Sequence, residues 1–296
     1  MWAGIDVLFL FQDIRMDIPI LGDLSVALSS RLVYLVLPVM LMAWFYWFVD
    51  RREGEIIGVG LVSSMLFTLC LKYGIAQPRP WELDPGIEYV PGSNAHGYSC
   101  PSGHATITSA TFLPAALFCG RAVASAILVA LTVSVILARL VLCAHTPLDI
   151  AVGLAVGISS ALVAWKLVDL GGRSERAYYV LNAVYAVLFT VLFLVTAVFW
   201  GAGLEDIAEY AGFFYGMIIG RVLEHVYVSC EVPARSFKSK VQGYVVGMSA
   251  AGVLFLIPAV ILPGTGTIIG GFLLMLWLFF LFPKIACDSK LMDKMQ

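Results

Sequence analysis

The chain has 296 residues, of which 60% are hydrophobic and only 13% are charged, and its mean hydropathy is +0.92. A soluble globular domain is about 45–50% apolar and about 25% charged, so this composition excludes an ordinary soluble domain. The formal net charge is −2 and no basic arm or long block of like charges is present, which argues against nucleic-acid binding. The sequence therefore predicts an all-α bundle that crosses a membrane several times.

The chain begins with a segment that differs from the rest. Residues 1–30 mix apolar and acidic side chains and are interrupted by Pro19 and Gly22, which predicts a short amphipathic segment on the membrane surface. After it, apolar runs of about 20 residues recur, each long enough to cross the hydrocarbon core as a helix. We predict about nine spans, at residues 32–50, 55–73, 104–120, 122–143, 148–168, 178–200, 207–228, 241–262 and 266–285.

The basic residues predict how these spans are oriented. Most Lys and Arg residues lie in loops 51–54, 120–121, 166–177 and 229–240 and in the C-terminal tail, whereas the loop between the sixth and seventh spans has none. Basic residues concentrate on the cytoplasmic side of membrane proteins. The N-terminus is therefore expected outside and the C-terminus in the cytoplasm.

This topology brings several polar residues to the outer ends of the early spans. Lys72 ends the second span and Arg79 follows it in the stretch KYGIAQPRP. Arg139 and His145 lie at the end of the fourth span, and Asp149 begins the fifth. The loop at residues 74–103 is also long, and loops of that length in a compact fold are usually functional. We interpret this clustering on one membrane face as a site.

These groups suit the chemistry of phosphoryl transfer. Lys72, Arg79 and Arg139 supply three cations for a phosphate dianion and for the charge that develops in the transition state. In the stretch PSGH, Ser102 offers a hydroxyl and Gly103 leaves the backbone open to close approach. The start of the helix that follows adds free N–H groups and the positive end of its dipole.

Two histidines of the same face could carry the bond-making steps. Asp149 stands four residues after His145, within reach across one helical turn. A carboxylate there can hold one imidazole nitrogen as a donor and leave the other free to attack phosphorus. His104 can then protonate the leaving oxygen and later activate water.

The same residues resemble the type 2 phosphatidic acid phosphatase superfamily, whose motifs read K-x6-R-P, P-S-G-H and S-R-x5-H-x3-D. The chain has Lys72-x6-Arg79-Pro80, then Pro101-Ser102-Gly103-His104, then Ala138-Arg139-x5-His145-x3-Asp149. All spacings fit, and the resemblance covers roughly residues 55–165. The one departure is Ala138, where the family usually has serine. It removes a hydroxyl but no charged or proton-transferring group, so activity is expected to survive.

The resemblance implies a metal-independent phosphatase that needs no cofactor and works through a phosphohistidine. His145 would be the nucleophile, Asp149 its orienting carboxylate and His104 the acid/base, and the phosphoryl group would be bound by Lys72, Arg79, Ser102, Gly103 and Arg139. The chain would divide into the surface segment 1–30, a phosphatase core at 31–170 and C-terminal helices at 171–296. The nine-span arrangement resembles the glucose-6-phosphatase and sphingosine-phosphate phosphatase branches.

The substrate is left open by the sequence. A site at the outer interface suits a phosphorylated lipid, such as an isoprenyl pyrophosphate or phosphatidic acid, and membrane lipids would then be the other partners. The alternatives are a soluble sugar phosphate, or a transporter or scaffold that keeps the fold without catalysis, although intact His104, His145 and Asp149 argue against the latter. We expect a multi-pass cell-membrane protein whose site faces the periplasm, the exterior or an organelle lumen. A homodimer is left open.

The seventh span carries a stripe of small residues. Gly212, Gly216 and Gly220 repeat every four residues, which predicts close helix packing. Arg221, Glu224 and His225 follow toward the cytoplasmic end, where we expect them to pair among themselves.

Overall fold

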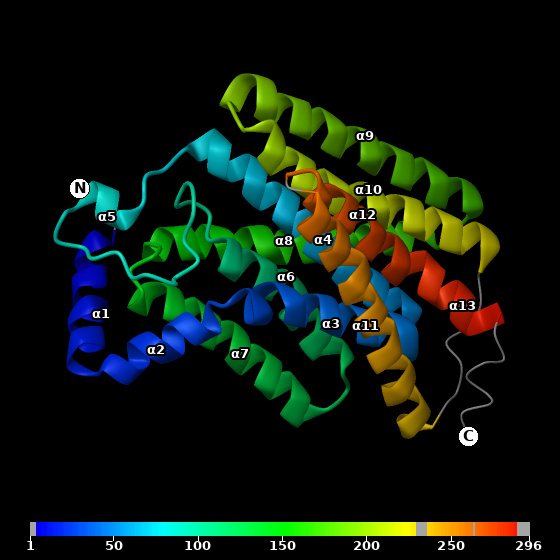
Figure 1. The fold of residues 1–296 in the computed structure, drawn as a ribbon, viewed down its shortest axis with the longest axis horizontal. Coiled ribbons are helices and arrows are strands. Elements are labelled where there is room, and N and C mark those ends of the chain that lie inside the picture. The colour runs from blue at the N-terminus through cyan, green and yellow to red at the C-terminus, as the bar shows by residue number, and fades with distance from the viewer. Residues whose placement is uncertain (1–3, 229–235, 263, 289–296) are drawn as a thin grey trace. The chain divides into compact units, whose positions relative to one another are not determined.

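The structure is a computed structural model that describes residues 4–228, 236–262 and 264–288, except for the side chains of residues 204–206 and 209. Within these ranges every regular element is helical, so the predicted all-α fold is confirmed (Figure 1). The chain forms two compact units, which are described separately. Unit 1 comprises Met1–Leu41 and Ile56–Lys166, and unit 2 comprises Met42–Glu55 and Leu167–Gln296.

The membrane spans can be counted in the described part of the chain. Six stretches are long and apolar enough to cross a bilayer: Arg51–Leu83, Ala122–Val141, Pro147–Gly171, Glu175–Trp200, Phe237–Ile261 and Gly266–Cys287. A seventh is obtained if Pro19–Leu28 and Leu32–Phe48, which meet at a bend of 40°, form one broken span. Of the remaining predicted spans, α6 (Gly103–Phe118) is helical but has only 16 residues, and α10 (Leu204–Tyr227) contains several charged residues. Nine spans and the orientation therefore remain predictions.

The helices of unit 1 begin with a pair that packs on α7. In chain order the unit contains α1 (Ile5–Asp17), α2 (Pro19–Leu28), the π-helical turn η1 (Leu32–Val36), the start of α3 (Leu37–Phe48), α4 (Arg51–Ile75) from Ile56 onward, α5 (Pro80–Leu83), α6, α7 (Ala122–Val141) and α8 (Pro147–Gly171) up to Lys166. Helices α1 and α2 both contact α7. The N-terminal segment thus forms two helices of unit 1, separated at Pro19.

The N-terminal pair also holds the long loop after α5. The amide of Gln12 donates to the Gly86 carbonyl at 2.9 Å and accepts from the Glu88 N–H at 2.8 Å. Leu8 packs in one buried cluster with Ile87 and Cys143. Because one side chain satisfies backbone groups on both sides of Ile87, α1 fixes the position of this loop in unit 1.

Helices α6 and α8 approach closely where α8 has small residues. An added Cβ at Gly153 would lie 2.8 Å from the Ser102 carbonyl and 3.1 Å from the Ala105 Cβ. Gly153 therefore allows the start of α6, with its polar motif, to lie directly against the start of α8.

Unit 2 is built on α10 and the helices that follow it. Its elements are α9 (Glu175–Trp200), α10, α11 (Phe237–Ile261), α12 (Gly266–Leu276), the π-helical turn η2 (Trp277–Leu281) and α13 (Phe282–Asp288), together with residues 42–55. The glycine stripe of α10 packs against α12, where Gly212 faces the Ile268 backbone and Gly216 faces that of Phe272. The predicted role of this stripe in helix packing is thus confirmed.

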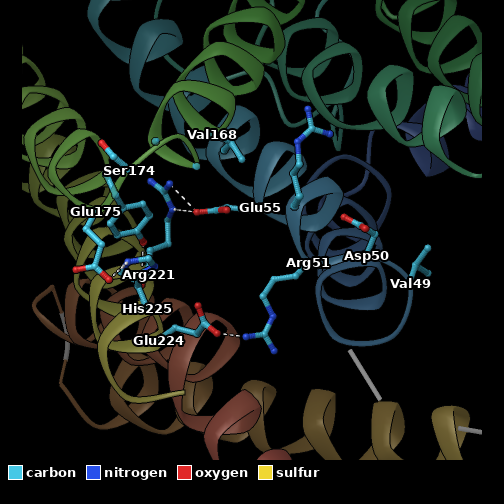
Figure 2. A pocket seen from close by; sticks show the side chains of 14 residues that line it. Val49, Asp50, Arg51, Glu55, Val168, Ser174, Glu175, Arg221, Glu224 and His225 are labelled. Atoms are coloured by element: carbon cyan, nitrogen blue, oxygen red, sulfur yellow. Dashed lines mark hydrogen bonds and ion pairs between the residues drawn. The ribbon is translucent and has the colours of Figure 1, made fainter. Parts of the chain in front are cut away.

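A cavity of about 830 Å³ lies in unit 2 among charged side chains (Figure 2). Arg221 donates to Glu55 at 2.6 Å and to Asn182 at 2.8 Å, and Arg51 forms an ion pair with Glu224. His225 stacks on Tyr178 with a centroid distance of 4.1 Å. The expected pairing of Arg221, Glu224 and His225 among themselves is therefore wrong. Residues three or four apart on one helix are neighbours in sequence, but α4 and α9 supply partners that lie closer in space.

Candidate active site

The polar residues of the three motifs meet in unit 1 at the ends of four helices. Lys72 lies in the last turn of α4, Ser102 caps the start of α6, Arg139 lies in the last turn of α7 and Asp149 in the first turn of α8. Arg79, which precedes α5, and His145, which lies between α7 and α8, complete the cluster together with Gly103 and His104 at the start of α6. The structure thus brings together side chains that the sequence separates by up to 77 positions.

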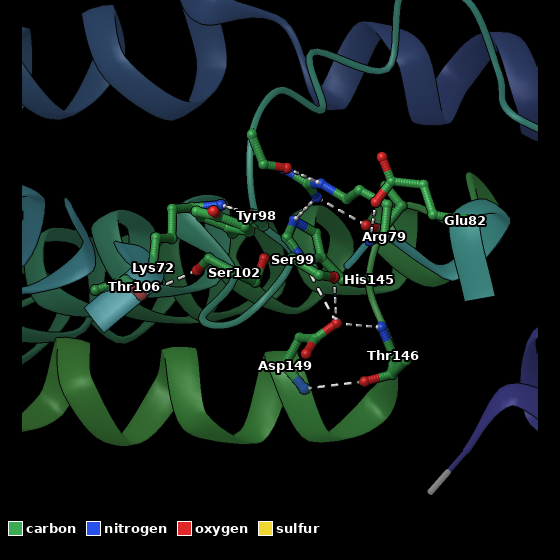
Figure 3. A network of polar contacts seen from close by, with 12 residues as sticks. Lys72, Arg79, Glu82, Tyr98, Ser99, Ser102, Thr106, His145, Thr146 and Asp149 are labelled. Carbon is green, nitrogen blue, oxygen red and sulfur yellow. Dashed lines mark hydrogen bonds and ion pairs between the residues drawn. The ribbon is translucent and has the colours of Figure 1, made fainter. Parts of the chain in front are cut away.

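Asp149 is held by groups other than His145 (Figure 3). Its Oδ2 accepts a hydrogen bond from the Thr146 N–H at 2.7 Å and another from the Ser99 hydroxyl at 2.7 Å. The Asp149 N–H donates in turn to Thr146 Oγ1 at 3.2 Å, so the two residues cap the start of α8 reciprocally. The carboxylate is therefore fully buried and fixed in orientation before any contact with the histidine is counted.

His145 lies between this carboxylate and a guanidinium. Its Nδ1 is 3.8 Å from Asp149 Oδ2, longer than a hydrogen bond, and its Nε2 is 3.1 Å from Arg79 Nη1. Since a guanidinium only donates, Nε2 accepts and carries the lone pair, and Nδ1 carries the proton that faces Asp149. The pKa of His145 lies well below its ordinary value, because burial disfavours the imidazolium and because Arg79, Arg139 and Lys72 repel it. The imidazole is thus neutral, as a nitrogen nucleophile must be.

Arg79 is fixed by backbone carbonyls on every side of its guanidinium. Nε donates to Gly97 at 2.8 Å, Nη2 to His96 at 2.6 Å and Nη1 to Ala144 at 2.9 Å. All three acceptors are carbonyls, so these bonds fix the position of the guanidinium and its positive charge. Such a fixed cation beside a nucleophile is suited to a developing phosphoryl charge.

Two further groups present buried donors that no protein acceptor in the described residues engages. Arg139 is fully buried; its Nη1 donates to the Ser93 carbonyl at 2.5 Å, while Nε and Nη2 have no partner. The Ser102 hydroxyl is likewise buried without a hydrogen bond. An unpaired buried cation is costly, and an anion with several acceptor oxygens would relieve that cost.

Lys72 and His104 complete the cluster. The Lys72 ammonium donates to the Tyr98 carbonyl in the same loop that holds Arg79. His104 is buried, and its Nε2 lies 3.1 Å from the Ser29 carbonyl at the end of α2. The side chain of His96 is exposed, and only its carbonyl reaches Arg79.

Sequence reasoning missed several members of this cluster. Ser99 binds the Asp149 carboxylate, the carbonyls of His96, Gly97 and Ala144 hold Arg79, and Ser29 contacts His104. Backbone carbonyls have no sequence signal at all. Ser99, three residues before Ser102, could have been singled out only as a small polar residue beside the PSGH motif.

Comparisons with known proteins match two parts of the chain to described families. Residues 55–173 match the family described as PAP2 superfamily, and residues 208–294 match the family described as PAP2 superfamily phosphatase, transmembrane extension. The chain is 34% identical over 127 residues to decaprenylphosphoryl-5-phosphoribose phosphatase from the CDC 1551 and H37Rv strains of Mycobacterium tuberculosis. That alignment covers 43% of this chain and 66% of the relative. No solved structure matches.

Proposed function

Since this chain belongs to the PAP2 superfamily, we propose that it hydrolyses the phosphate monoester or pyrophosphate of a lipid through a phosphohistidine intermediate. The observation that carries the proposal is the buried His145, with Nε2 turned toward the Arg79 guanidinium and Nδ1 toward the Asp149 carboxylate. A neutral imidazole in this setting has its lone pair at the position where cations would hold a phosphoryl group.

In the first step, Nε2 of His145 attacks phosphorus and the bond from phosphorus to the leaving oxygen breaks. His104 donates a proton to that oxygen, so the lipid leaves as a neutral alcohol, or as a phosphate if the substrate is a pyrophosphate. Nδ1 of His145 keeps its proton and becomes part of a cationic phosphoimidazole, which the Asp149 carboxylate at 3.8 Å stabilises.

In the second step, water attacks phosphorus and the bond to Nε2 breaks. His104, left neutral by the first step, takes a proton from this water, so inorganic phosphate leaves and both histidines return to their starting forms. Lys72, Arg79, Arg139, the Ser102 hydroxyl and the Gly103 N–H bind the phosphoryl oxygens through both steps. The unengaged donors of Arg139 and Ser102 support this assignment.

A lipid is favoured as the substrate by the relative. The name of the mycobacterial protein describes a phosphatase of a lipid-linked phosphoribose, a phosphate monoester on a polyprenyl carrier. A site among the ends of membrane helices also suits a substrate whose tail stays in the bilayer. We propose a multi-pass cell-membrane protein with its site at the outer face, with residues 1–30 as a surface segment, 31–170 as the catalytic core and 171–296 as C-terminal helices.

Phosphate release from a panel of substrates tests the proposal. The purified protein is assayed with a polyprenylphosphoryl-5-phosphoribose, an isoprenyl pyrophosphate, phosphatidic acid and glucose 6-phosphate, each with and without EDTA. We expect release from a lipid phosphate that EDTA does not reduce. Preference for glucose 6-phosphate would instead support the sugar phosphatase alternative, and loss of activity in EDTA would refute metal independence.

Two variants separate the nucleophile from a general loss of structure. His145→Ala should abolish release, and wild-type protein quenched in alkali during turnover should carry an acid-labile phosphate at His145 that mass spectrometry detects. His225→Ala, a substitution of a partly exposed histidine of unit 2, is the matched control and should keep activity. Unchanged release by His145→Ala would refute His145 as the nucleophile, whereas no release by the wild-type protein from any substrate would favour the transporter or scaffold alternative.

A further inference from the structure

His104 makes two contacts with a part of the chain that precedes the family match. Its Nε2 lies 3.1 Å from the Ser29 carbonyl, and its ring packs on the ring of Tyr34 with a centroid distance of 4.0 Å and an angle of 42°. Ser29 and Tyr34 precede residue 55, where the match begins. The surroundings of His104 are therefore built partly by the N-terminal helices of unit 1.

The Ser29 carbonyl is available because the helix breaks there. In a continuous helix it would accept the N–H of Val33, but that N–H donates to Ser30 at 3.0 Å, where α2 ends and η1 begins at a bend of 40°. Carbonyls at the end of a helix lack partners within the helix and carry the negative end of its dipole. Broken helices in membrane proteins use such carbonyls to line sites.

The carbonyl determines which nitrogen of His104 reacts. A carbonyl only accepts, so Nε2–H donates to Ser29 and Nδ1 is the nitrogen whose proton can be exchanged. When Nδ1 also carries a proton, the ring is a cation. The carbonyl at the helix end stabilises this cation, which can then donate the Nδ1 proton. The arrangement gives His104 the orienting partner that Asp149 provides for His145.

Asn94 holds this carbonyl from the other side. Its Nδ2 donates to the Ser29 oxygen at 3.0 Å, and its φ of +50° is in the left-handed region that Asn tolerates better than most residues. Ser29 itself is fully buried. The loop that carries Arg79's partners therefore also fixes the acceptor of His104.

We propose that the Ser29 carbonyl, held by Asn94, and the Tyr34 ring are the positioning groups of His104, and that His104 exchanges its catalytic proton through Nδ1. This inference rests on the proposed function, because it assigns partners to the acid/base of that reaction. Asn94 acts through the Ser29 carbonyl and Tyr34 through its ring contact with His104.

Comparing substrates with different leaving groups shows whether Asn94 and Tyr34 position His104 or only support the structure. A lipid phosphate monoester needs a proton on its leaving alkoxide, whereas 4-nitrophenyl phosphate releases a stable phenolate without one. The parameter to compare is kcat/KM, which reports the steps up to departure of the leaving group. A general acid contributes about 10²–10⁴-fold, so partial loss of its orientation should cost about tenfold for the lipid phosphate only.

The test uses Asn94→Gly and Tyr34→Leu in the full-length protein. Glycine keeps the left-handed backbone of residue 94 and removes only the donor. We expect both variants to lose about tenfold in kcat/KM for the lipid phosphate and less than twofold for 4-nitrophenyl phosphate, while Tyr34→Phe keeps both. Tyr227→Leu, at a residue that is 62% exposed in unit 2, is the matched control.

Each other outcome refutes a defined step. Equal losses for both substrates would show a structural role for Asn94 and Tyr34, and no loss for either would show that His104 does not depend on them. Failure of the proposed function itself would give other results. Either His104→Ala would retain full activity toward the lipid phosphate, or the wild-type protein would release phosphate from no substrate in the panel.

Discussion

Arg79→Lys keeps a positive charge beside His145 but removes the planar guanidinium whose several N–H groups hold that charge in position. The guanidinium donates to three carbonyls, those of His96, Gly97 and Ala144, and faces His145 Nε2 at 3.1 Å. A lysine ammonium is a single point on a flexible stem and cannot reach acceptors that surround a planar group.

The magnitude follows from these contacts. A hydrogen bond from a charged donor contributes about 1.5–3 kcal/mol, so if lysine retains one of the three carbonyl bonds, the loss is about 3–6 kcal/mol of stability. Loss of a preorganised donor to the transition state costs about 10²–10³-fold in rate. We therefore expect kcat/KM to fall about 100-fold or more, together with a lower melting temperature in detergent.

Phosphate release and a thermal melt of the same preparation measure both effects. Arg15→Lys is the matched control in unit 1, because Arg15 makes only long contacts, at 3.4 and 3.5 Å, and should lose little stability or activity. An Arg79→Lys protein with kcat/KM within threefold of wild type would refute the reasoning, since charge alone would then suffice.

Three further predictions follow from the described contacts. Ser99→Ala removes a hydrogen bond to the buried Asp149 carboxylate and should reduce kcat about tenfold with a loss of about 1.5–3 kcal/mol of stability, so unchanged phosphate release would contradict its positioning role. The pKa of His145 in the folded protein lies below the unfolded value of 6.5, so the unfolded chain binds more protons. The stability that His145 contributes is therefore complete above about pH 6.5 and is lost as the pH falls below it. Melting temperatures measured at several pH values should depend less on pH in His145→Gln than in the wild type. Gly216→Leu places a side chain where even a Cβ would lie 2.9 Å from the Phe272 Cα, so it should lower the melting temperature strongly. Gly252→Leu should not, because no described atom lies within 4 Å of a Cβ added there; equal melting temperatures would show that α10 and α12 can separate without cost.

Many residues of the candidate site could be predicted because their signals are local. His145 and Asp149 are only four residues apart, on either side of the start of α8, and the PSGH motif opens a helix whose start lies in the cluster. The prediction that was wrong concerns contacts between helices that are distant in the sequence. The partners of Arg221 and Glu224 are Glu55 and Arg51, which no spacing along α10 could reveal. The number of spans stayed open because α6 is short and α10 is charged, so hydropathy alone does not decide whether they cross the membrane.

The membrane class of the protein and the residue types of the candidate site could be read from the chain alone, because hydropathy over about 20 residues and motif spacing are local properties. Only the tertiary structure decided which atoms meet. It turned Nε2 of His145 toward Arg79, gave Asp149 a donor from Ser99, and gave His104 an acceptor from the break after α2. These pairs are 66, 50 and 75 residues apart in the chain, so no local pattern records them. The first two pairs form because packing brings together side chains from distant segments, and the third forms because packing places a backbone carbonyl that any residue type would present.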